Sequence, residues 1–416
     1  MIKDTTMNPN ILAINGGPKT RETPFSSGSR YGEAEKKEIM DVFNNGRLSY
    51  WSKFKVNSFC DRVKEYFSCG YCAGGSSGSA VIHAAVAALE IPPGYEVISS
   101  PITDIGTLIG VLYQNLIPVF ADVDPHTYNM TAESIRSRIT DRTRALIVVH
   151  LAGNPCEMDE IMELAREYKI PVIEDCAQAY NSIYKGRKAG TIGSAGCFSL
   201  NESKHISCGD GGFAITDDEE LFYGMHNYLD KYYDRFQRGN RMFRLAPCYR
   251  LSELQYAVAL AQLDKIDTIT DTRARHAESL TRQIKHNAAI SVPKVYPHNK
   301  SSFWFYMFRL NPEKISCSIN DFVMALKAEG ISAVAGYIPR PIYLEKMFTE
   351  KAFFPGNVWP AELAAGKSYS YEPGLCPVAE EVLASAVRVP VSEFFTSRDV
   401  DDIASAINKV LAVYTK

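Results

Sequence analysis

The chain has 416 residues, of which 46% are hydrophobic and 22% charged, and its formal net charge is -3. This length predicts two or three domains with a substantial core, and the small negative charge gives no reason to expect nucleic acid or an anionic membrane as a partner. The chain contains no run of about 18 apolar residues, so we predict no membrane span. The first residues lack the apolar stretch of a signal peptide, and we therefore expect a cytoplasmic protein.

The first notable feature along the chain is the pair Cys69 and Cys72, which has the spacing of a redox pair or of half a zinc site. No second pair with matching spacing follows, so we predict neither a metal site nor redox use for this pair. Ten cysteines are scattered along the chain, and some, such as Cys176 and Cys197, lie inside apolar runs. Buried thiols behave as small hydrophobic groups, and a cytoplasmic chain keeps them reduced.

A stretch rich in glycine and serine at 74–80 precedes an apolar helical segment at 81–89. The free N–H groups and the positive dipole end at the start of a helix bind phosphate, which makes Gly78 and Ser79 candidate ligands. The stretch lacks the Gly-Lys-Ser/Thr of nucleotide hydrolases. Taken alone, it is also consistent with an ordinary loop before a helix.

The middle of the chain alternates apolar strands with helical patterns. We predict strands at 96–101, 117–124, 145–150 and 170–175, with helices at 107–113, 132–138 and 157–168. Continuous apolar strands separated by helices indicate a mostly parallel sheet that is covered on both faces. In such sheets ligands bind beyond the carboxyl ends of the strands. The pattern therefore predicts an α/β fold with a site at that edge.

Three residues at or just past predicted strand ends point to a cofactor. Asp175 ends the strand at 170–175, Ser199 ends a short apolar strand, and Lys204 follows five residues later, before the glycines of 209–212. A lysine amine forms an imine with an aldehyde, a carboxylate pairs with a protonated ring nitrogen, and a serine binds phosphate. Pyridoxal phosphate carries all three groups. The alternative for Lys204 is an ordinary solvated charge, but an apolar interior would help its amine to lose the proton.

The last third of the chain differs in character. We predict a polar helix at 268–285, a strand at 304–309, a helix at 319–329, a strand at 331–334 and a closing amphipathic helix at 399–414. Helices and strands joined by longer loops suggest a small α+β domain. We therefore expect a large cofactor-binding domain at 1–267 and a small domain at 268–416.

Four stretches resemble the DegT/DnrJ/EryC1/StrS family in its order and rough spacing: Ser77–Ala80, Glu174–Ala179, Ser199–Lys204 with the glycines that follow, and Tyr249–Gln255. The resemblance runs from about residue 11 to the C-terminus. It implies a fold-type I, pyridoxal-phosphate-dependent aminotransferase of sugars or cyclitols. The segments 12–18 and 376–380 are similar to those of inosose aminotransferases and 3-amino-5-hydroxybenzoate synthases, which act on ring ketones in antibiotic pathways.

The resemblance implies a role for each matching residue. Lys204 would carry the cofactor and, once released, move a proton between substrate and cofactor. Asp175 would pair with the pyridine nitrogen, and Gln178 would contact the phenolic oxygen. The phosphate would be bound by Ser199, Gly78 and Ser79.

One departure from the family pattern lies within the expected site. Where the family places an aromatic ring over the cofactor, this chain has Asp104, which we keep among the cofactor-binding candidates. Another aromatic residue, such as Tyr50 or Trp51, would have to take the place of that ring. Tyr337 falls where the small domain of the family contributes a substrate contact, and a purely structural loop is the alternative.

A second departure concerns assembly. Where the family has an asparagine that reaches the phosphate of a partner subunit, this chain has Cys248, which is a poor donor. The segment 223–250 is dense in aromatic residues and cations, which are enriched at interfaces. A mobile basic loop on a monomer is the alternative. We expect a homodimer with shared active sites, in which the phosphate contact comes from a cation that matches phosphate geometry, either Arg250 or Arg241.

These features predict an aminotransferase that moves an amino group from glutamate or glutamine to a ketone on a sugar- or cyclitol-like ring, in secondary-metabolite or polysaccharide biosynthesis. Two alternatives remain. One is another reaction of the same cofactor on a keto-sugar, such as dehydration, although family members that dehydrate often have His in place of the lysine. The other is a non-catalytic binding relative, which Asp104 and Cys248 favour and which Lys204 and Asp175 oppose.

Overall fold

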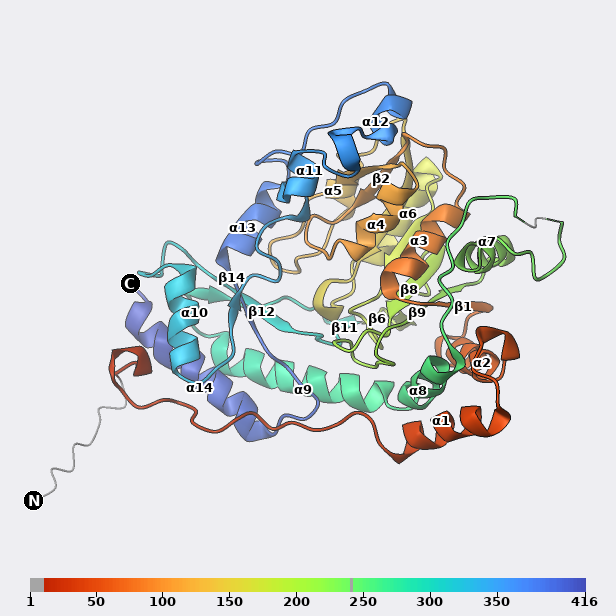
Figure 1. The fold of residues 1–416 in the computed structure, drawn as a ribbon. Helices are drawn as coiled ribbons and strands as arrows, with labels where there is room; N and C mark the ends of the chain where they lie inside the picture. Colours follow the sequence, from red (N-terminus) through yellow and green to blue (C-terminus); the bar gives the residue numbers. More distant parts are fainter. Residues whose placement is uncertain (1–10, 240–241) are drawn as a thin grey trace, which may run out of the picture.

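The computed structural model describes residues 11–239 and 242–416 (Figure 1). The start of the chain, on which the expectation about a signal peptide rests, and Arg241 lie outside the described residues. Within the two described ranges, no helix is both long enough and apolar enough to cross a membrane.

A seven-stranded sheet forms the centre of the fold. Its strands lie in the order β1 (Tyr71–Gly75), β9 (Gly212–Thr216), β8 (Ala195–Ser199), β5 (Val172–Asp175), β4 (Thr143–Val149), β2 (Glu96–Ser99) and β3 (Ile117–Phe120). β9 is antiparallel to both of its neighbours, and the remaining neighbours pair in parallel. Parallel neighbours need crossover connections, which are usually helices. The predicted mostly parallel α/β sheet is confirmed.

Helices cover both faces of this sheet, because successive residues of a buried strand point to opposite sides. In β4, Ile147 packs against the layer of α3 (Gly78–Ala88), α4 (Gly106–Tyr113) and α7 (Glu219–Leu229). Leu146 and Val148 face the other layer, which contains α5 (Ala132–Arg136) and α6 (Met158–Tyr168). On that second face, α2 (Lys55–Phe67) and α8 (Glu253–Leu263) cover β8 and β9.

A second, four-stranded sheet is built from the C-terminal part of the chain (Figure 1). It is antiparallel, in the order β10 (Ile290–Ser291), β12 (Tyr306–Leu310), β14 (Ala386–Val389) and β13 (Val334–Ala335). Its core is completed by α9 (Ile266–Ile284), α10 (Ile319–Ala328) and α14 (Ser397–Tyr414), and Leu12 from the start of the chain packs into it. The expected domain boundary at 267/268 falls in the first turn of α9 and stays a prediction.

The remaining elements are a small sheet and several helices. A three-stranded sheet has the order β11 (Asn299–Lys300), β6 (Ile183–Tyr184) and β7 (Arg187–Lys188). The other helices are α1 (Glu33–Asn45), α11 (Lys346–Thr349), α12 (Pro360–Ala365) and α13 (Pro377–Ser385). Of these, α11, α12 and α13 contribute buried side chains to a further hydrophobic cluster. Short 3-10 turns lie at Ala13–Asn15, Tyr50–Ser52, Leu151–Gly153, Ile342–Leu344 and Pro355–Asn357.

The predicted strands and helices of the middle segment are confirmed, with ends that differ by a few residues. Two predictions in the last third need correction. The strand expected at 304–309 begins only at Tyr306, and the strand expected at 331–334 is wrong in extent, because β13 comprises only Val334 and Ala335.

Candidate active site

A cavity of about 350 Å³ lies at the carboxyl-terminal edge of the parallel strands. Seven of the eight residues predicted for the site line it: Lys204, Asp175, Gln178, Ser199, Gly78, Ser79 and Asp104. β5 ends at Asp175, β8 ends at Ser199, and α3 begins at Gly78, so three separate elements deliver their ends to one place. The edge predicted from the strand pattern is the edge at which the structure places the cavity.

Lys204 lies in the loop after β8, and its side chain is half-buried. Its Nζ lies 3.7 Å from the centre of the Trp304 ring. Burial lowers the pKa of the Lys204 amine, while the carboxylates of Asp175 and Asp104 act in the opposite direction. An amine of this kind is neutral, and therefore nucleophilic, at a lower pH than an exposed lysine.

Asp175 is buried at the end of β5, and both of its carboxylate oxygens accept hydrogen bonds. The Thr107 hydroxyl donates to Oδ2 at 2.7 Å, and the backbone N–H of Ala177 donates to Oδ1 at 3.0 Å. Because the single hydroxyl proton of Thr107 is used in this way, Thr103 Oγ1 donates to Thr107 Oγ1, at 2.6 Å. Burial raises the pKa of Asp175, and the bond from Thr107 opposes that rise. The hydrogen bonds fix the direction in which the carboxylate faces the cavity.

The start of α3 forms one end of the cavity. The N–H groups of Gly78 and Ser79 lie in the first turn of the helix, where no helical carbonyl can accept from them. A Cβ on Gly78 would lie 2.8 Å from Cβ of Ser199, and a Cβ on Gly106 would lie 2.3 Å from Oγ of Ser79. Glycine at both positions therefore keeps open a cradle of N–H and hydroxyl donors, which suits a phosphate group.

Gln178 connects Ala152, which follows β4, to Tyr337, which follows β13, across the cavity. Its Oε1 accepts a hydrogen bond from the backbone N–H of Ala152 at 2.7 Å, and its Nε2 donates to the Tyr337 hydroxyl at 3.1 Å. Tyr337 in turn stacks on Phe305, with ring centres 5.0 Å apart. The expected position of Tyr337 at the site is confirmed, and its contact with substrate stays a prediction.

Asp104 lines the cavity, and its Oδ1 accepts a hydrogen bond from the N–H of Gly106 at 2.8 Å, which caps the start of α4. Neither Tyr50 nor Trp51 lines the cavity of their own chain. The aromatic residue that lies beside Lys204 is Trp304 instead, and its indole N–H donates to the Ser203 carbonyl at 2.7 Å.

Sequence reasoning missed Trp304, Thr107 and Thr103 as site residues. Trp304 stands about a hundred positions from Lys204 along the chain and was assigned to a strand. Thr107 had one usable signal, because it lies in the first turn of a helix that follows a parallel strand, where side chains face the ligand edge.

A network of Arg30, Glu393 and Arg273 holds the loop that carries Lys204. The Arg30 guanidinium donates to the backbone carbonyl of Lys204 and pairs with Glu393. Glu393 also pairs with Arg273 at 2.7 Å, and Arg273 donates to the Trp304 carbonyl, also at 2.7 Å. Both oxygens of the Glu393 carboxylate are thereby paired with a cation. The network therefore ties together the backbone segments that carry Lys204 and Trp304.

Arg250 does not line the cavity of its own chain. It lies against Asp230, with an N–O distance of 3.3 Å, and its guanidinium is 5.4 Å from the Trp51 ring centre. Cys248 is exposed and forms an isolated bridge with Asp230. The expected contact of Arg250 with a cofactor phosphate across an interface thus stays a prediction.

Among the residues that the structure describes, one buried cluster has ligand atoms close enough for a metal ion: His150, Glu174 and Cys176. The Glu174 carboxylate already accepts backbone N–H groups from Gly190, Ile192 and Gly193, at 2.9, 2.7 and 2.6 Å. Nδ1 of His150 accepts from the Cys156 N–H, so its Nε2 carries the proton that is donated to Glu174 at 2.9 Å. These bonds assign the cluster to holding β4, β5 and the following turn together.

A model of the DegT/DnrJ/EryC1/StrS aminotransferase family matches residues 29–408. The chain belongs to this family. Enzymes of the DegT/DnrJ/EryC1/StrS family are pyridoxal-phosphate-dependent aminotransferases, and this chain is such an enzyme, with pyridoxal phosphate as its cofactor.

Relatives of this DegT/DnrJ/EryC1/StrS aminotransferase include those expected from the ends of the chain. A putative L-glutamine:3-amino-2,3-dideoxy-scyllo-inosose aminotransferase from Micromonospora echinospora is 30% identical over 411 residues, which cover 96% of each chain. The crystal structure of an aminotransferase from Psychrobacter cryohalolentis has a TM-score of 0.84 and 27% identity, and the match covers 94% of this chain and 99% of that one. The structure of 3-amino-5-hydroxybenzoic acid synthase, with a TM-score of 0.82 and 22% identity, shares the fold over 94% of this chain and 100% of its own.

Proposed function

We propose that this enzyme moves an amino group from glutamine or glutamate to a ketone on a sugar- or cyclitol-like ring. One observation carries the proposal: a half-buried lysine amine and a buried carboxylate face one cavity whose far end is the open start of a helix. The glutamine-dependent inosose aminotransferase named above supports both the donor and the class of acceptor. The presence of Lys204, where dehydrating members of the family often have His, favours amino transfer over dehydration.

The cavity residues fit pyridoxal phosphate in number and in chemistry. Ser199 and the first turn of α3 would hold the phosphate, Asp175 the pyridine nitrogen, Gln178 the phenolic oxygen and Lys204 the aldehyde carbon. When bound, the cofactor supplies a carbon for covalent attachment and a ring that withdraws electrons.

The protein supplies charge, orientation and proton transfer. Asp175 is fixed by Thr107 and Ala177, so its negative charge favours a proton on a ring nitrogen placed against it. Lys204, with its lowered pKa, can accept a proton in one step and return it in the next. The Trp304 ring covers the amine on one side and excludes water from it.

We also infer the assembly and the compartment. The segment between α7 and α8, which we call the arm, carries two exposed apolar side chains, Phe243 and Leu245. Their exposure supports a homodimer. Asp104 and Arg250 complete the proposed set of cofactor-binding residues, the second of them across the interface. All ten cysteines are free thiols, which supports a reducing compartment, namely the cytoplasm.

The donor half of the reaction tests the proposal. The enzyme loaded with pyridoxal phosphate is mixed with L-glutamine or L-glutamate, and the absorption band of the lysine-bound cofactor is followed. Amino transfer to the cofactor requires that the band disappear with at least one of the two donors. A band that survives both donors would show that the enzyme does not use them.

A further inference from the structure

The Lys204 amine lies over the face of the Trp304 ring, with its Nζ atom 3.7 Å from the ring centre. Within residues 11–239 and 242–416, this amine makes no hydrogen bond and no ion pair, although an ammonium group carries three donors. The face of an aromatic ring is rich in electrons and attracts a cation at such a distance. The indole is therefore the direct partner of the amine.

Three hydrogen bonds hold the Trp304 side chain where the amine meets it. Its indole N–H donates to the Ser203 carbonyl at 2.7 Å, its backbone N–H donates to the Ala152 carbonyl at 2.9 Å, and its own carbonyl accepts from Arg273 at 2.7 Å. Ser203 directly precedes Lys204 in the chain. The ring is therefore tied to the same loop that carries the amine.

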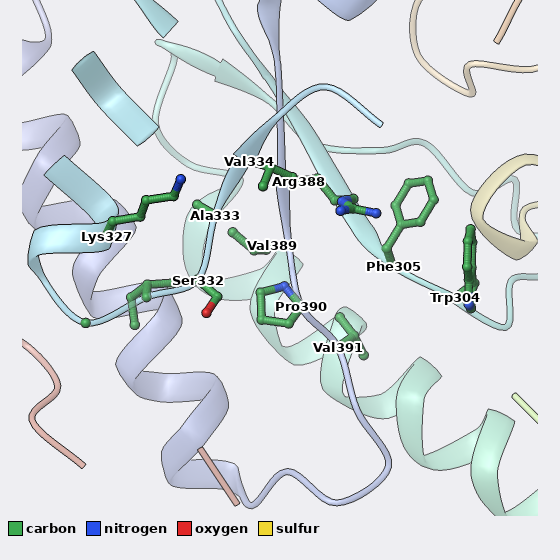
Figure 2. Close-up of a pocket in the computed structure, with 12 residues that line it drawn as sticks. Trp304, Phe305, Lys327, Ser332, Ala333, Val334, Arg388, Val389, Pro390 and Val391 are labelled. Atoms are coloured by element: carbon green, nitrogen blue, oxygen red, sulfur yellow. The ribbon is translucent and has the colours of Figure 1, made fainter. Parts of the chain in front are cut away.

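These hydrogen bonds matter because close packing alone does not fix the ring. Trp304 lines the active-site cavity and also a second cavity, of about 670 Å³, beside the four-stranded sheet. Figure 2 shows Trp304 next to Phe305 at the margin of that second cavity, and the two ring centres are 5.4 Å apart. With open space toward two cavities, the indole would be free to turn if its N–H group were not bonded.

The groups around the amine act on its proton in different directions. Burial lowers the pKa of Lys204, while the carboxylates of Asp175 and Asp104 raise it. His205, the next residue, is buried, and burial holds its pKa well below the ordinary value, so it adds no charge beside the amine. The face of the Trp304 ring stabilises the protonated amine only, because a neutral amine carries no charge for it to attract.

We propose that Trp304 is a catalytic residue, whose ring receives the Lys204 amine when it is released from the cofactor and stabilises the ammonium group that forms when the amine takes up a proton. During amino transfer the amine of the donor displaces that of Lys204, which then takes a proton from one carbon and returns it to another. A ring face suits this role, because it attracts the ammonium group without a hydrogen bond that must be broken before the proton is returned. The inference rests on the proposed function for the displacement by a donor.

Fluorinated tryptophans test the interaction without a large change in the shape of the side chain. Fluorine withdraws electrons from the ring face, so mono-, di- and trifluorinated tryptophan are placed at position 304 in turn. The pKa of Lys204 in the cofactor-free enzyme is read by NMR from lysine labelled at Cε, and the signal is assigned by its loss in Lys204→Ala. We expect the midpoint to fall with each fluorine, by about half a pH unit to one unit over the series.

The same series at Trp359 is the matched control. Trp359 is buried against Phe353 and Tyr371, and it does not line the cavity of Lys204. The midpoint should stay constant in these proteins. Equal midpoints across the series at Trp304 would overturn the proposal, because a ring with a purely structural role fills its space with or without fluorine.

A second NMR measurement follows the position of the amine. An aromatic ring moves the proton signals of a group over its face upfield, so the Cε protons of Lys204 should be displaced in the cofactor-free enzyme and again with pyridoxamine phosphate bound. Trp304→Leu should remove this displacement, and so should pyridoxal phosphate in the unaltered enzyme, because it takes the amine. Signals that are not displaced with pyridoxamine phosphate would overturn the proposal. These measurements use neither donor nor acceptor, so a failed donor half-reaction refutes the proposed function separately.

Discussion

At Lys204, burial and nearby charge act in opposite directions on one amine. Burial lowers its pKa and exceeds the effect of the carboxylates of Asp175 and Asp104. We therefore predict that the rate at which pyridoxal phosphate attaches to the cofactor-free enzyme rises with pH and levels off below about 10.4, the value for free lysine. Stopped-flow absorption at a series of pH values measures this rate.

Asp104→Asn is the matched test of that balance. Removing one carboxylate removes an influence that raises the pKa of Lys204, so the midpoint of the attachment rate should move to a still lower pH.

Borohydride reduction followed by peptide mapping must find the cofactor on Lys204. A midpoint at the free-lysine value, or an adduct on another lysine, contradicts the prediction.

Asp175→Asn should keep the fold and lose most of the turnover, on the order of a hundredfold, because a neutral amide cannot stabilise charge on the ring nitrogen. Turnover at saturating donor and the absorption spectrum of the bound cofactor are the measurements. Thr107→Val is the graded control, since it removes one hydrogen bond to the carboxylate and leaves the charge. Near-normal turnover of Asp175→Asn would place the carboxylate away from the nitrogen.

Individual site residues could be predicted where the residues next to them in the sequence indicate a strand end or a sharp turn. Asp175 and Ser199 end apolar strands, and Lys204 precedes a glycine cluster, so local pattern and chemistry were sufficient. Trp304 was not predictable, because only tertiary packing brings it beside Lys204.

At the scale of elements, His83 links α3 to three other segments. Tyr228 of α7 and Gln114 at the end of α4 lie 2.8 and 2.9 Å from its Nε2, and the Tyr249 hydroxyl lies 3.2 Å from its Nδ1. Gln114 also donates to the Tyr228 oxygen, so the Tyr228 proton points to Nε2. Burial lowers the pKa of His83 to about 4.

This pairing predicts a loss of stability in mild acid. Below its ordinary pKa of 6.5, His83 takes up a proton in the unfolded chain but not in the folded one, so stability falls between about pH 6.5 and 4. The slope is about 1.4 kcal/mol per pH unit for one such group. His83→Gln should show a flatter decline in urea unfolding at pH 7, 6 and 5, and an unchanged slope would contradict the assignment. His226, which is similarly shifted, remains in both proteins.

The strands and helices were predicted well where the hydrophobic pattern extends over many residues. The strands of the parallel sheet are buried on both faces, which leaves a continuous apolar run in the sequence. The order of the strands and the reversed direction of β9 depend on long-range pairing, and no local pattern encodes them. Most of the strand expected at 331–334 does not form, because the position opposite Ser332 in the register of β13 with β14 is Pro390, which lies about 60 residues away in the sequence.

For the whole molecule, the arm after α7 predicts a dimer. Leu245 is 96% exposed, and Met242 and Phe243 are each 57% exposed. Apolar side chains this exposed, close to Arg250, suit a surface that a second copy covers. Lys204→Ala and Arg250→Ala should each be inactive alone, and should regain part of the activity when they are unfolded and refolded together.

The recovered activity should approach a quarter of that of the unaltered dimer. Random mixing makes about half of the dimers mixed, and each of these has one intact site. Analytical ultracentrifugation gives the mass independently. An active monomer at high dilution, or no recovery on mixing, contradicts the shared site.

The Arg30–Glu393–Arg273 network has a consequence for biosynthesis. Figure 1 shows the N-terminal segment passing beneath α9 before it reaches α1, and Glu393 lies near the end of the 416-residue chain. The network that supports the loop of Lys204 is therefore complete only when Arg30 and Glu393 are both present. On a ribosome, residues 1–267 emerge well before Glu393, so a nascent chain that already contains Lys204 still lacks the clamp. We expect uptake of the cofactor to follow release of the finished chain, and chains truncated before Glu393 to leave the ribosome without it.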